Sequence, residues 1–544
     1  MNKSKLSIIS FFLVLLLVIT GCSTTTGSDE GKEKDGGKKE GPKILRLNNS
    51  SEPGSLHPGT AQGTHDSWVL EHVLEGLTKK SPDGKIVPGV AKDWTVSPDG
   101  KKYTFNLQEG TKWSNGDPVT AHDFEFAWKY ALDPKTASNY AYQLYYITGA
   151  KEFNEKKGTA EQVGVKALND YTLEVNLVAP TAYFIDLVSF YTYLPVNKKV
   201  QEANPKWATE GDSYVSNGPF KLTEWKHKTS IKIEKNENYY DKDKIKLDEV
   251  HFALIEDENT AWQMYKNNEL DLVYPLPSDV QGQLVKSKPK DFYNAKELAL
   301  YYYNFNNKVK PFNNVKVRKA LSMAIDRKVI TENVAQGEQP PAYAIIPPGV
   351  PDAKGDFQKN TGDLFKEDVN EAKKLLKEGL KEEGMDKMPE FTILFNTLDA
   401  HKKIAEAVQG MWKENLGVNV TLESVEFQVK IDREKAGDYK VSRAGWIGDY
   451  VDPMTFSDLW LTGGTQNDAK YSNAKYDELV NKAKVNNNIE ERSKQLHEAE
   501  KILIEEMPIM PIYFYTKPYV LNEKVTGVFS PINRYPQFMY ADIK

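Results

Sequence analysis

The sequence predicts an α/β protein whose body is divided into two or three domains. From about Leu300 onward, apolar residues switch between helical and strand spacing, as in the expected strand at 391–395 and the expected helix at 400–416. Strands separated by helices are typical of an α/β sheet. The body from Ile44 to the end has about 500 residues, which is more than a single hydrophobic core usually organises.

The first residues predict export from the cell. Lys3 and Lys5 precede an apolar run at 6–18, and small residues follow up to Cys22. This pattern is typical of a secretory signal peptide, here 1–21. The apolar run is shorter than the roughly 20 residues that cross a bilayer.

Cys22 is the only cysteine of the chain, and it stands where a bacterial lipobox places its lipidated cysteine. We expect lipid chains on Cys22, such as palmitate, to anchor the protein at the extracytoplasmic face of the cell membrane. The alternative is a cysteine left inside a signal that is cleaved elsewhere. Residues 23–43 contain no apolar side chain, so we expect 22–43 to form a flexible tether with a reach of about 25 Å.

The first half of the body shows strand and turn signals. The pentapeptide Ser-Pro-Asp-Gly-Lys occurs at 81–85 and at 97–101, and we interpret both copies as hairpin turns. A helix is expected to start near Thr120 or Ala121 and to run through Trp128. Further elements are expected as a helix at 67–77 and strands at 44–47, 103–107, 172–178 and 230–236.

The second half predicts longer helices. One is expected from about 315 to 334 with Gly337 as its stop, and another at 400–416 that ends at Gly417. The remaining elements are expected as helices at 369–380 and 488–506 and strands at 418–422 and 512–515. Nothing between 44 and 544 has the pattern of a transmembrane span.

The composition excludes several classes of function. A formal net charge of −6 argues against nucleic-acid binding, which usually needs a basic balance. The sequence contains no nucleophile elbow, no phosphate-binding loop and no dinucleotide motif. The eight histidines form no metal-binding cluster, so we expect no metal and no cofactor. These absences favour a binding protein over an enzyme. A pair of catalytic carboxylates, as in glycosidases, is neither supported nor excluded by counting acidic residues, because their separation is a property of the structure.

Five stretches carry a resemblance to a known family. They read E-P-G-S-L-H-P-G at 52–59, Y-T-F-N-L-Q-E-G-T-K-W-S-N-G-D-P-V-T-A-H-D-F at 103–124, S-N-G-P-F at 216–220, V-R-K-A-L-S-M-A-I-D-R at 317–327 and R-A-G-W-I-G-D-Y-V-D-P at 443–453. Together with the lipobox and the tether, they resemble the oligopeptide-binding proteins of bacterial ABC importers, in family 5 of the extracytoplasmic solute-binding proteins. The stretch at 103–124 marks the wider superfamily, whose members also bind dipeptides, nickel or haem.

The resemblance implies a three-domain, periplasmic-binding-protein-like fold of type II, in which two main lobes close around a ligand. It implies a discontinuous domain I at 44–74, 199–300 and 517–544, an inserted domain II at 75–198, and a domain III at 301–516. The implied partners are an oligopeptide ligand, the permease subunits and, through them, the ATPase subunits. We expect a monomer.

The resemblance also implies how a peptide is held. Asp449 matches the family residue that binds the peptide's α-amino group. The residue types suit this role, because a buried ammonium needs an anion, and because Asp452 before Pro453 is the better helix cap. The family pairs the peptide backbone with strand-like segments, which here are Gly63-Thr64 and Gly445-Trp446-Ile447.

Other residues match family positions along the site. His401 and Arg443 match positions that handle the peptide's C-terminal end, where a carboxylate needs a cation or a helix N-terminus. Tyr140 and Tyr515 match lining positions, although either could be ordinary packing. Phe427 stands where relatives often have Trp, and Ile447 stands where some have Cys, so the preferences of the side-chain pockets stay open.

A metal or haem carrier of the same superfamily is disfavoured, because clusters of ligand residues are lacking, and two further alternatives remain from the sequence. The first is a dipeptide or cell-wall (murein) peptide binder of the same family, which would have a shorter and more selective site. The second, from a different class, is a surface hydrolase or adhesin lipoprotein. A hydrolase would cleave a peptide that a binding protein returns intact.

Overall fold

The structure is a computed structural model that describes residues 41–181 and 183–544. Pro42–Lys544 form one compact unit. The expected signal peptide, Cys22 and nearly all of the expected tether lie outside the described residues.

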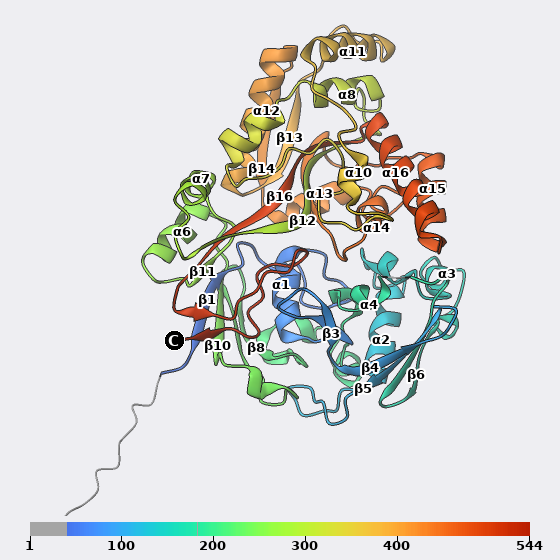
Figure 1. The fold of residues 1–544 in the computed structure, drawn as a ribbon, viewed down its shortest axis with the longest axis vertical. Helices are drawn as coiled ribbons and strands as arrows, with labels where there is room; N and C mark the ends of the chain where they lie inside the picture. The colour runs from blue at the N-terminus through green and yellow to red at the C-terminus, as the bar shows by residue number, and fades with distance from the viewer. Residues whose placement is uncertain (1–40, 182) are drawn as a thin grey trace, which may run out of the picture. The chain divides into compact units, whose positions relative to one another are not determined.

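The largest element is a ten-stranded mixed sheet (Figure 1). Its strand order is β14 (Val420–Val425), β13 (Phe391–Asn396), β15 (Val441–Ile447), β12 (Phe292–Phe305), β16 (Ile509–Leu521), β11 (Leu272–Val273), β1 (Ile44–Asn48), β10 (Glu249–Ala253), β9 (Ser230–Lys235) and β8 (Phe220–Lys226).

This sheet consists of two halves with a narrow junction. The C-terminal half-sheet contains β12 to β16, and the N-terminal half-sheet contains β1 and β8 to β11. Among the described strands, the halves are paired only where Leu272 and Val273 of β11 meet Leu521 and Val520 of β16. The long strands β12 and β16 pair with each other along most of their length, with a shift in register between Lys296 and Leu300. Two of the predicted domain boundaries, near 300 and 517, fall close to this interruption.

A separate four-stranded antiparallel sheet lies within the predicted inserted domain. Its order is β4 (Ala91–Val96), β5 (Lys102–Leu107), β7 (Thr172–Asn176) and β6 (Val165–Asn169). Both Ser-Pro-Asp-Gly-Lys turns are confirmed as hairpins: the first joins β2 (Thr78–Lys80) to β3 (Ile86–Pro88), and the second joins β4 to β5. In each turn the serine hydroxyl donates a hydrogen bond to the carboxylate of the aspartate two residues later, and such local side-chain bonds are typical of turns. The last small sheet pairs β17 (Val525–Thr526) with β18 (Asp542–Ile543).

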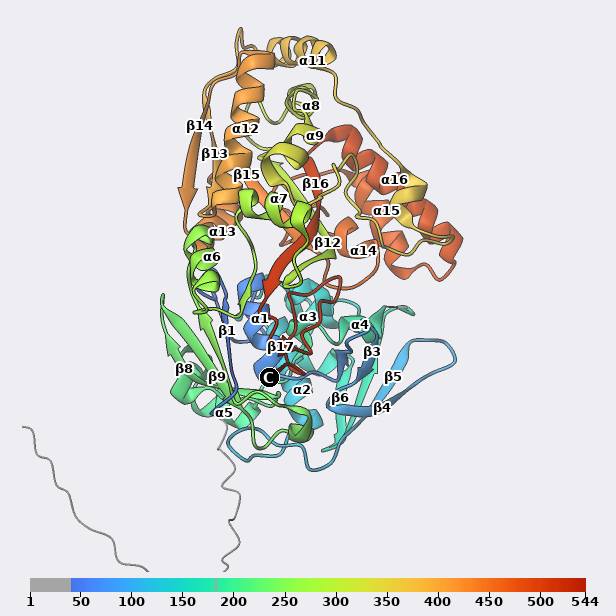
Figure 2. The ribbon, with the colours of Figure 1, turned by 60° about the vertical axis from the view of Figure 1, so that its left-hand side comes forward.

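Helices cover the sheets. The N-terminal part has α1 (Thr64–Val73), α2 (Ala121–Leu132), α3 (Ala150–Asn154), α4 (Phe184–Leu187), α5 (Lys198–Ala203), α6 (Glu258–Lys266) and α7 (Ser278–Ser287). The C-terminal part has α8 (Val315–Met323), α9 (Arg327–Val329), α10 (Phe357–Thr361), α11 (Val369–Glu382), α12 (Asp399–Leu416), α13 (Phe427–Ala436), α14 (Met454–Ser457), α15 (Ala474–Val485) and α16 (Ile489–Glu506). The helices α15 and α16 lie side by side in both views (Figures 1 and 2).

Short turns of helix connect these elements. They are 3-10 turns at η1 (Ala141–Leu144), η2 (Ala160–Gln162), η3 (Tyr191–Tyr193), η4 (Trp207–Thr209), η5 (Gly211–Ser213) and η6 (Lys242–Lys244), and a π turn at η7 (Ile330–Ala335). Within residues 41–181 and 183–544, no helix is both long and apolar enough to span a bilayer.

Most expected elements are confirmed, and the differences have local causes. The helix expected at 315–334 is divided into α8, α9 and η7, because the Asp326 carboxylate accepts a hydrogen bond from the Val329 N–H and starts a new helix. Its stop is Gln336, with φ of 59°, rather than Gly337. Gly417 does end α12, with φ of 69°. The strand expected at 418–422 begins two residues later, at Val420.

Candidate functional site

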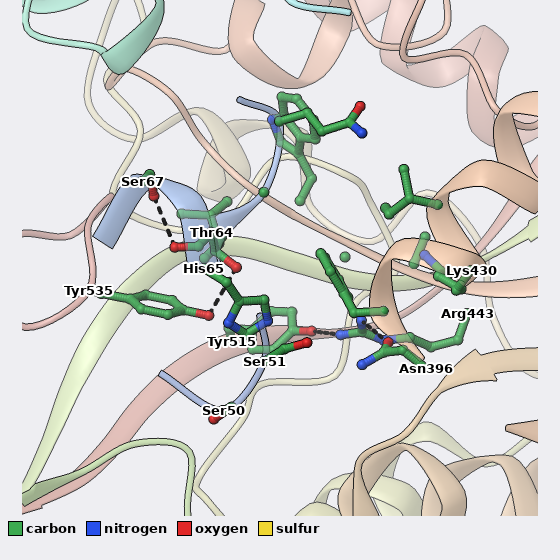
Figure 3. A pocket seen from close by; sticks show the side chains of 18 of the residues that line it. Ser50, Ser51, Thr64, His65, Ser67, Asn396, Lys430, Arg443, Tyr515 and Tyr535 are labelled. Carbon is green, nitrogen blue, oxygen red and sulfur yellow. Dashed lines mark hydrogen bonds between the residues drawn. The ribbon is translucent and has the colours of Figure 1, made fainter. Parts of the chain in front are cut away.

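A cavity of about 250 Å³ lies between segments of the two half-sheets. One wall comes from residues 50–67, which follow β1, and the opposite wall comes from β15, α12 and α13. Figure 3 shows side chains of both walls pointing toward one another. All eleven binding residues expected from the sequence line this cavity: Gly63, Thr64, Tyr140, His401, Phe427, Arg443, Gly445, Trp446, Ile447, Asp449 and Tyr515.

The strand β15 presents a free edge to the cavity. On one side it pairs with β12 from Val441 to Ile447. On the other side, β13 pairs with it only at Val441 and Ser442. Among the described strands, none pairs with residues 443–447 on that side, so their backbone groups are available to an added strand.

Asp449 lies just beyond β15, only 4 % exposed. Its backbone N–H donates to the Thr455 hydroxyl at 2.9 Å, and its carbonyl accepts from the Asn533 amide at 3.0 Å. The carboxylate oxygen Oδ2 accepts from Nε2 of Gln143 at 2.5 Å. Burial raises the pKa of Asp449 well above its ordinary value of 3.8, and the nearby Arg534 opposes this rise.

The N-cap position of α14 is Pro453 rather than Asp452, which the sequence predicted, but the Asp452 carboxylate contacts the start of this helix. Its Oδ1 accepts from the Met454 N–H at 2.9 Å at the start of α14. Arg492 binds the same carboxylate through both oxygens, at 3.1 and 2.6 Å. The Asp449 backbone N–H contacts Thr455 of α14, but among the described residues its carboxylate bonds no backbone N–H of a helix, so helix capping does not account for that side chain.

Arg443 is a buried cation on β15, with 8 % of its surface exposed. Its guanidinium donates to the Tyr515 hydroxyl and to Oδ1 of Asn396, the latter at 3.3 Å, as Figure 3 shows. It lies 4.6 Å from the ring centroid of Tyr301. In the described part of the chain, no carboxylate lies within ion-pairing distance of it, and its Nε has no hydrogen-bond partner.

His401 sits in the first turn of α12 and is buried. Its Nδ1 lies 3.4 Å from the Tyr301 hydroxyl. Burial lowers its pKa well below 6.5, and the charges of Arg443 and Lys430 lower it further. His401 is therefore neutral near pH 7, so it offers a hydrogen bond rather than the cation that the sequence reasoning allowed.

Aromatic rings form other parts of the lining. Trp446 stacks nearly parallel to Tyr140, with centroids 6.2 Å apart and planes 9° apart. Phe427, at the start of α13, meets His65 edge to face at 4.9 Å. The indole N–H of Trp446 is buried without a partner among the described residues. Tyr140 and Tyr515 both line the cavity, and both also pack against neighbouring rings, Tyr140 against Trp446 and Tyr515 against Tyr513.

One expectation about the local structure was wrong. Gly63-Thr64 was expected to pair like a strand, but Gly63 caps α1 and Thr64 is its first residue. The Gly63 N–H already donates to the Asp66 carboxylate at 3.1 Å, and the Gly63 carbonyl accepts from Ser67. The helix α1 therefore starts at Thr64, three residues before the helix expected at 67–77. Gly63 still approaches the opposite wall closely, since an added Cβ would lie 3.3 Å from the Phe427 ring.

Several lining residues were missed by the sequence reasoning. They include His65, Glu297, Asn304, Lys430, Glu434, Asn533, Arg534 and Tyr535. Lys430 and Glu434 form a buried ion pair at 2.6 Å, and their spacing of four residues is a usable sequence signal. Asn533 and Arg534 come from the chain's last segment, and nothing local marks them.

Comparison with known proteins decides the family. The model for bacterial extracellular solute-binding proteins of family 5 matches residues 85–468. The chain belongs to this family. It is 46 % identical to the oligopeptide-binding protein OppA of Bacillus subtilis and 41 % identical to the dipeptide-binding protein DppE of the same organism, with 97 % of each chain covered.

Solved structures of family members agree with the fold. Haemophilus influenzae OppA in complex with RPPGFSPFR gives a TM-score of 0.86 at 34 % identity, covering 93 % of this chain and 99 % of that one. The murein tripeptide-binding protein MppA of Escherichia coli also gives 0.86, at 33 % identity and with coverage of 92 % and 98 %. Its unliganded open form gives only 0.62, with coverage of 92 % and 97 %. The predicted α/β class with a type II binding-protein fold is confirmed, and the arrangement described here differs from that open form.

Proposed function

We propose that this family 5 member is the oligopeptide-binding component of an ABC importer. The observation that carries the proposal is one cavity that holds a buried carboxylate, a buried guanidinium and a free strand edge between them. Asp449 binds the peptide's ammonium, Arg443 binds an anionic group toward its C-terminal end, and β15 pairs with its backbone.

Each part of this site meets one requirement of a peptide zwitterion. A buried charge without a counter-charge costs several kcal/mol, so both peptide termini need partners. The peptide's N–H and C=O groups need hydrogen bonds, which the free edge at 443–447 supplies. Because main-chain pairing does not depend on side chains, this mode binds peptides of many sequences.

Length supports an oligopeptide over the dipeptide alternative. An extended strand rises about 3.3 Å per residue, so about 13 Å separates Arg443 from Ile447 along β15. Asp449 lies beyond Ile447. A dipeptide extends only about 7 Å. Relatives of this chain include a dipeptide-binding protein and a murein peptide-binding protein, so both are outcomes of the test below.

Calorimetry with tetra-alanine tests the proposal. We expect binding of the free peptide and a loss of at least tenfold in affinity for its N-acetylated form, which lacks the ammonium. Dialanine and a murein tripeptide serve as comparators. Equal affinity for acetylated and free peptide would contradict the assignment of Asp449. Mass spectrometry of the recovered peptide should find it intact, whereas cleavage products would favour the hydrolase.

The lipid anchor is part of the same proposal and rests on the sequence around Cys22. We expect Cys22→Ser to release the protein from the membrane, because no lipid can then be attached. Fractionation of cells into membrane and soluble portions measures this. Continued tight membrane retention of the variant would contradict a lipid anchor at Cys22. Peptide binding by the released protein should be unchanged. From its membership of this family, we infer that the protein acts as a monomer. We also infer that it delivers the peptide to the permease subunits and, through them, to the ATPase subunits.

A further inference from the structure

Gln143 is a fully buried amide that contacts Asp449 from a distant part of the chain. It belongs to η1, some 300 residues before Asp449, and has 0 % of its surface exposed. Its Nε2 donates to Oδ2 of Asp449 at 2.5 Å and lies 3.2 Å from the Tyr142 hydroxyl. Gln143 does not line the cavity, whereas Asp449 does.

The chemistry fixes how this amide is oriented. An ionised carboxylate can only accept hydrogen bonds, so when Asp449 is ionised the NH₂ group of Gln143 must face it, as it does in this structure. Its Oε1 is then buried without a partner among the described residues. An unsatisfied buried acceptor costs stability, so the contact is not explained by packing alone.

The surroundings of the carboxylate leave one oxygen for a ligand. Oδ2 is occupied by Gln143, while Oδ1 has no hydrogen-bond partner in residues 41–181 and 183–544. The charged and titratable groups that face Asp449 come from three directions: Arg534 from the C-terminal segment, Asp458 from beyond α14, and the hydroxyls of Tyr140, Tyr142 and Tyr191. Burial raises the pKa of Asp449, and the Gln143 hydrogen bond opposes that rise.

Other residues of the predicted inserted domain (75–198), to which Gln143 belongs, contact the loop that carries Asp449. The Tyr146 hydroxyl lies 3.2 Å from that of Tyr450, and the Tyr183 ring stacks on Tyr450 at 4.6 Å with planes 5° apart. Asp186 accepts from the Val451 N–H at 3.4 Å. Three consecutive loop residues, 449 to 451, therefore contact the predicted inserted domain (75–198) to which Gln143 belongs, and these contacts help to keep the amide and the carboxylate together.

We propose that Gln143 is a positioning residue for ligand recognition, which holds Asp449 in its charged form with a single oxygen turned to the cavity. The inference rests on the proposed function, because it concerns the same site. It also defines the ligand group more closely. One free oxygen suits an ammonium, which binds as a point charge, better than a guanidinium, which binds a carboxylate through both oxygens.

The test measures the pH profile of peptide affinity in the full chain. The probe is the tightest binder among tri-, tetra- and penta-alanine for the unaltered protein. In Gln143→Leu, which keeps the shape and removes the donor, we expect affinity near pH 7 to fall at least tenfold. We also expect the acid side of the profile, where affinity is lost, to move up by about one pH unit, because Asp449 then holds its proton more tightly.

Two further variants make the result decisive. Gln143→Met, which is flexible and apolar, replaces the leucine variant if that protein fails to fold. Gln108→Leu is the matched control, since Gln108 donates to the Gly89 carbonyl at 2.6 Å in the same part of the chain and lies off the cavity. We expect this control to keep the affinity and the profile of the unaltered protein.

The outcomes separate the inference from the proposed function. If the unaltered protein binds none of the three probes, the peptide function fails and the role of Gln143 fails with it. If it binds, but the Gln143 variants keep both the affinity and the acid limb, the positioning role is wrong. A weaker affinity with an unmoved acid limb also overturns it, because a purely structural defect predicts that pattern.

Discussion

The two charged ends of the cavity are built in different ways. Arg443 takes its contacts from within the C-terminal half-sheet: Tyr515 lies on β16, Asn396 on β13 and Tyr301 on β12. Apart from its N–H, which donates to the nearby Thr455 hydroxyl, Asp449 takes its contacts from far apart, from Gln143 in η1 and from Asn533 and Arg534 near the C-terminus. The cationic end is therefore preassembled, whereas the anionic end exists only when separate segments meet.

This difference predicts that recognition of the ammonium is coupled to the arrangement of the segments. A ligand that needs an ionised Asp449 favours the arrangement in which Gln143 supports that charge, since a ligand shifts an equilibrium toward the state that binds it better. Contacts at Arg443 carry no such coupling, because their partners share one sheet. Three predictions address the comparison.

The largest effect is expected from Asp449→Ala. Peptide affinity should fall by about 3 kcal/mol or more, because the buried ammonium loses its counter-charge. Calorimetry with tetra-alanine measures this. Asp452→Ala is the control, since that carboxylate contacts the start of α14 and binds Arg492 instead. Unchanged affinity in the Asp449 variant would remove this residue from the site.

A smaller effect is expected from Arg443→Met. Affinity for a peptide with a free carboxylate should fall by about 1.5–3 kcal/mol, the value of a hydrogen bond to a charged group. Thermal unfolding of the empty protein should not be impaired, because a buried cation without a carboxylate partner is removed. The C-terminally amidated peptide should bind both proteins alike. A large loss for the amidated peptide would contradict a contact to the carboxylate.

The smallest expected effect is the change in peptide affinity for each unit of pH. The peptide's ammonium requires an ionised Asp449, whose pKa in the empty protein is raised by burial. This contribution to affinity is fully present above that pKa and is lost as pH falls through it, at about 1.4 kcal/mol per pH unit. Affinity should also fall above roughly pH 8, where an α-amine loses its proton. Calorimetry across this range in Asp449→Ala should show no acid limb.

Much of the fold could be predicted because its signals are local. Alternating apolar residues identified β1, β5, β7 and β9, and a glycine in the left-handed region ended α12. The division of the segment after α8 was missed, because an apolar pattern does not register that Asp326 competes as a cap. Propensity and spacing describe neighbours along the chain, so they give no account of where β12 and β16 interrupt their pairing.

The candidate site divides in the same way. The residues from Arg443 to Asp449 lie on one strand and its loop, so a single stretch of sequence brought them together. Gln143 and Arg534 reach the same carboxylate only through tertiary contacts, and their own neighbours in sequence suggest no role. The charge state of His401 was also beyond the sequence, since burial decides it.

The free edge of β15 also bears on the protein's solubility. Unpaired strand edges are templates on which other chains assemble, and exposed ones promote aggregation. Here the open stretch, residues 443–447, lines a cavity that the rings of Tyr140 and Phe427 also line, although Gly445 itself is exposed. Very short edges are one way in which proteins limit strand addition by other chains. The edge that accepts an extended peptide is therefore a poor template for a second folded chain.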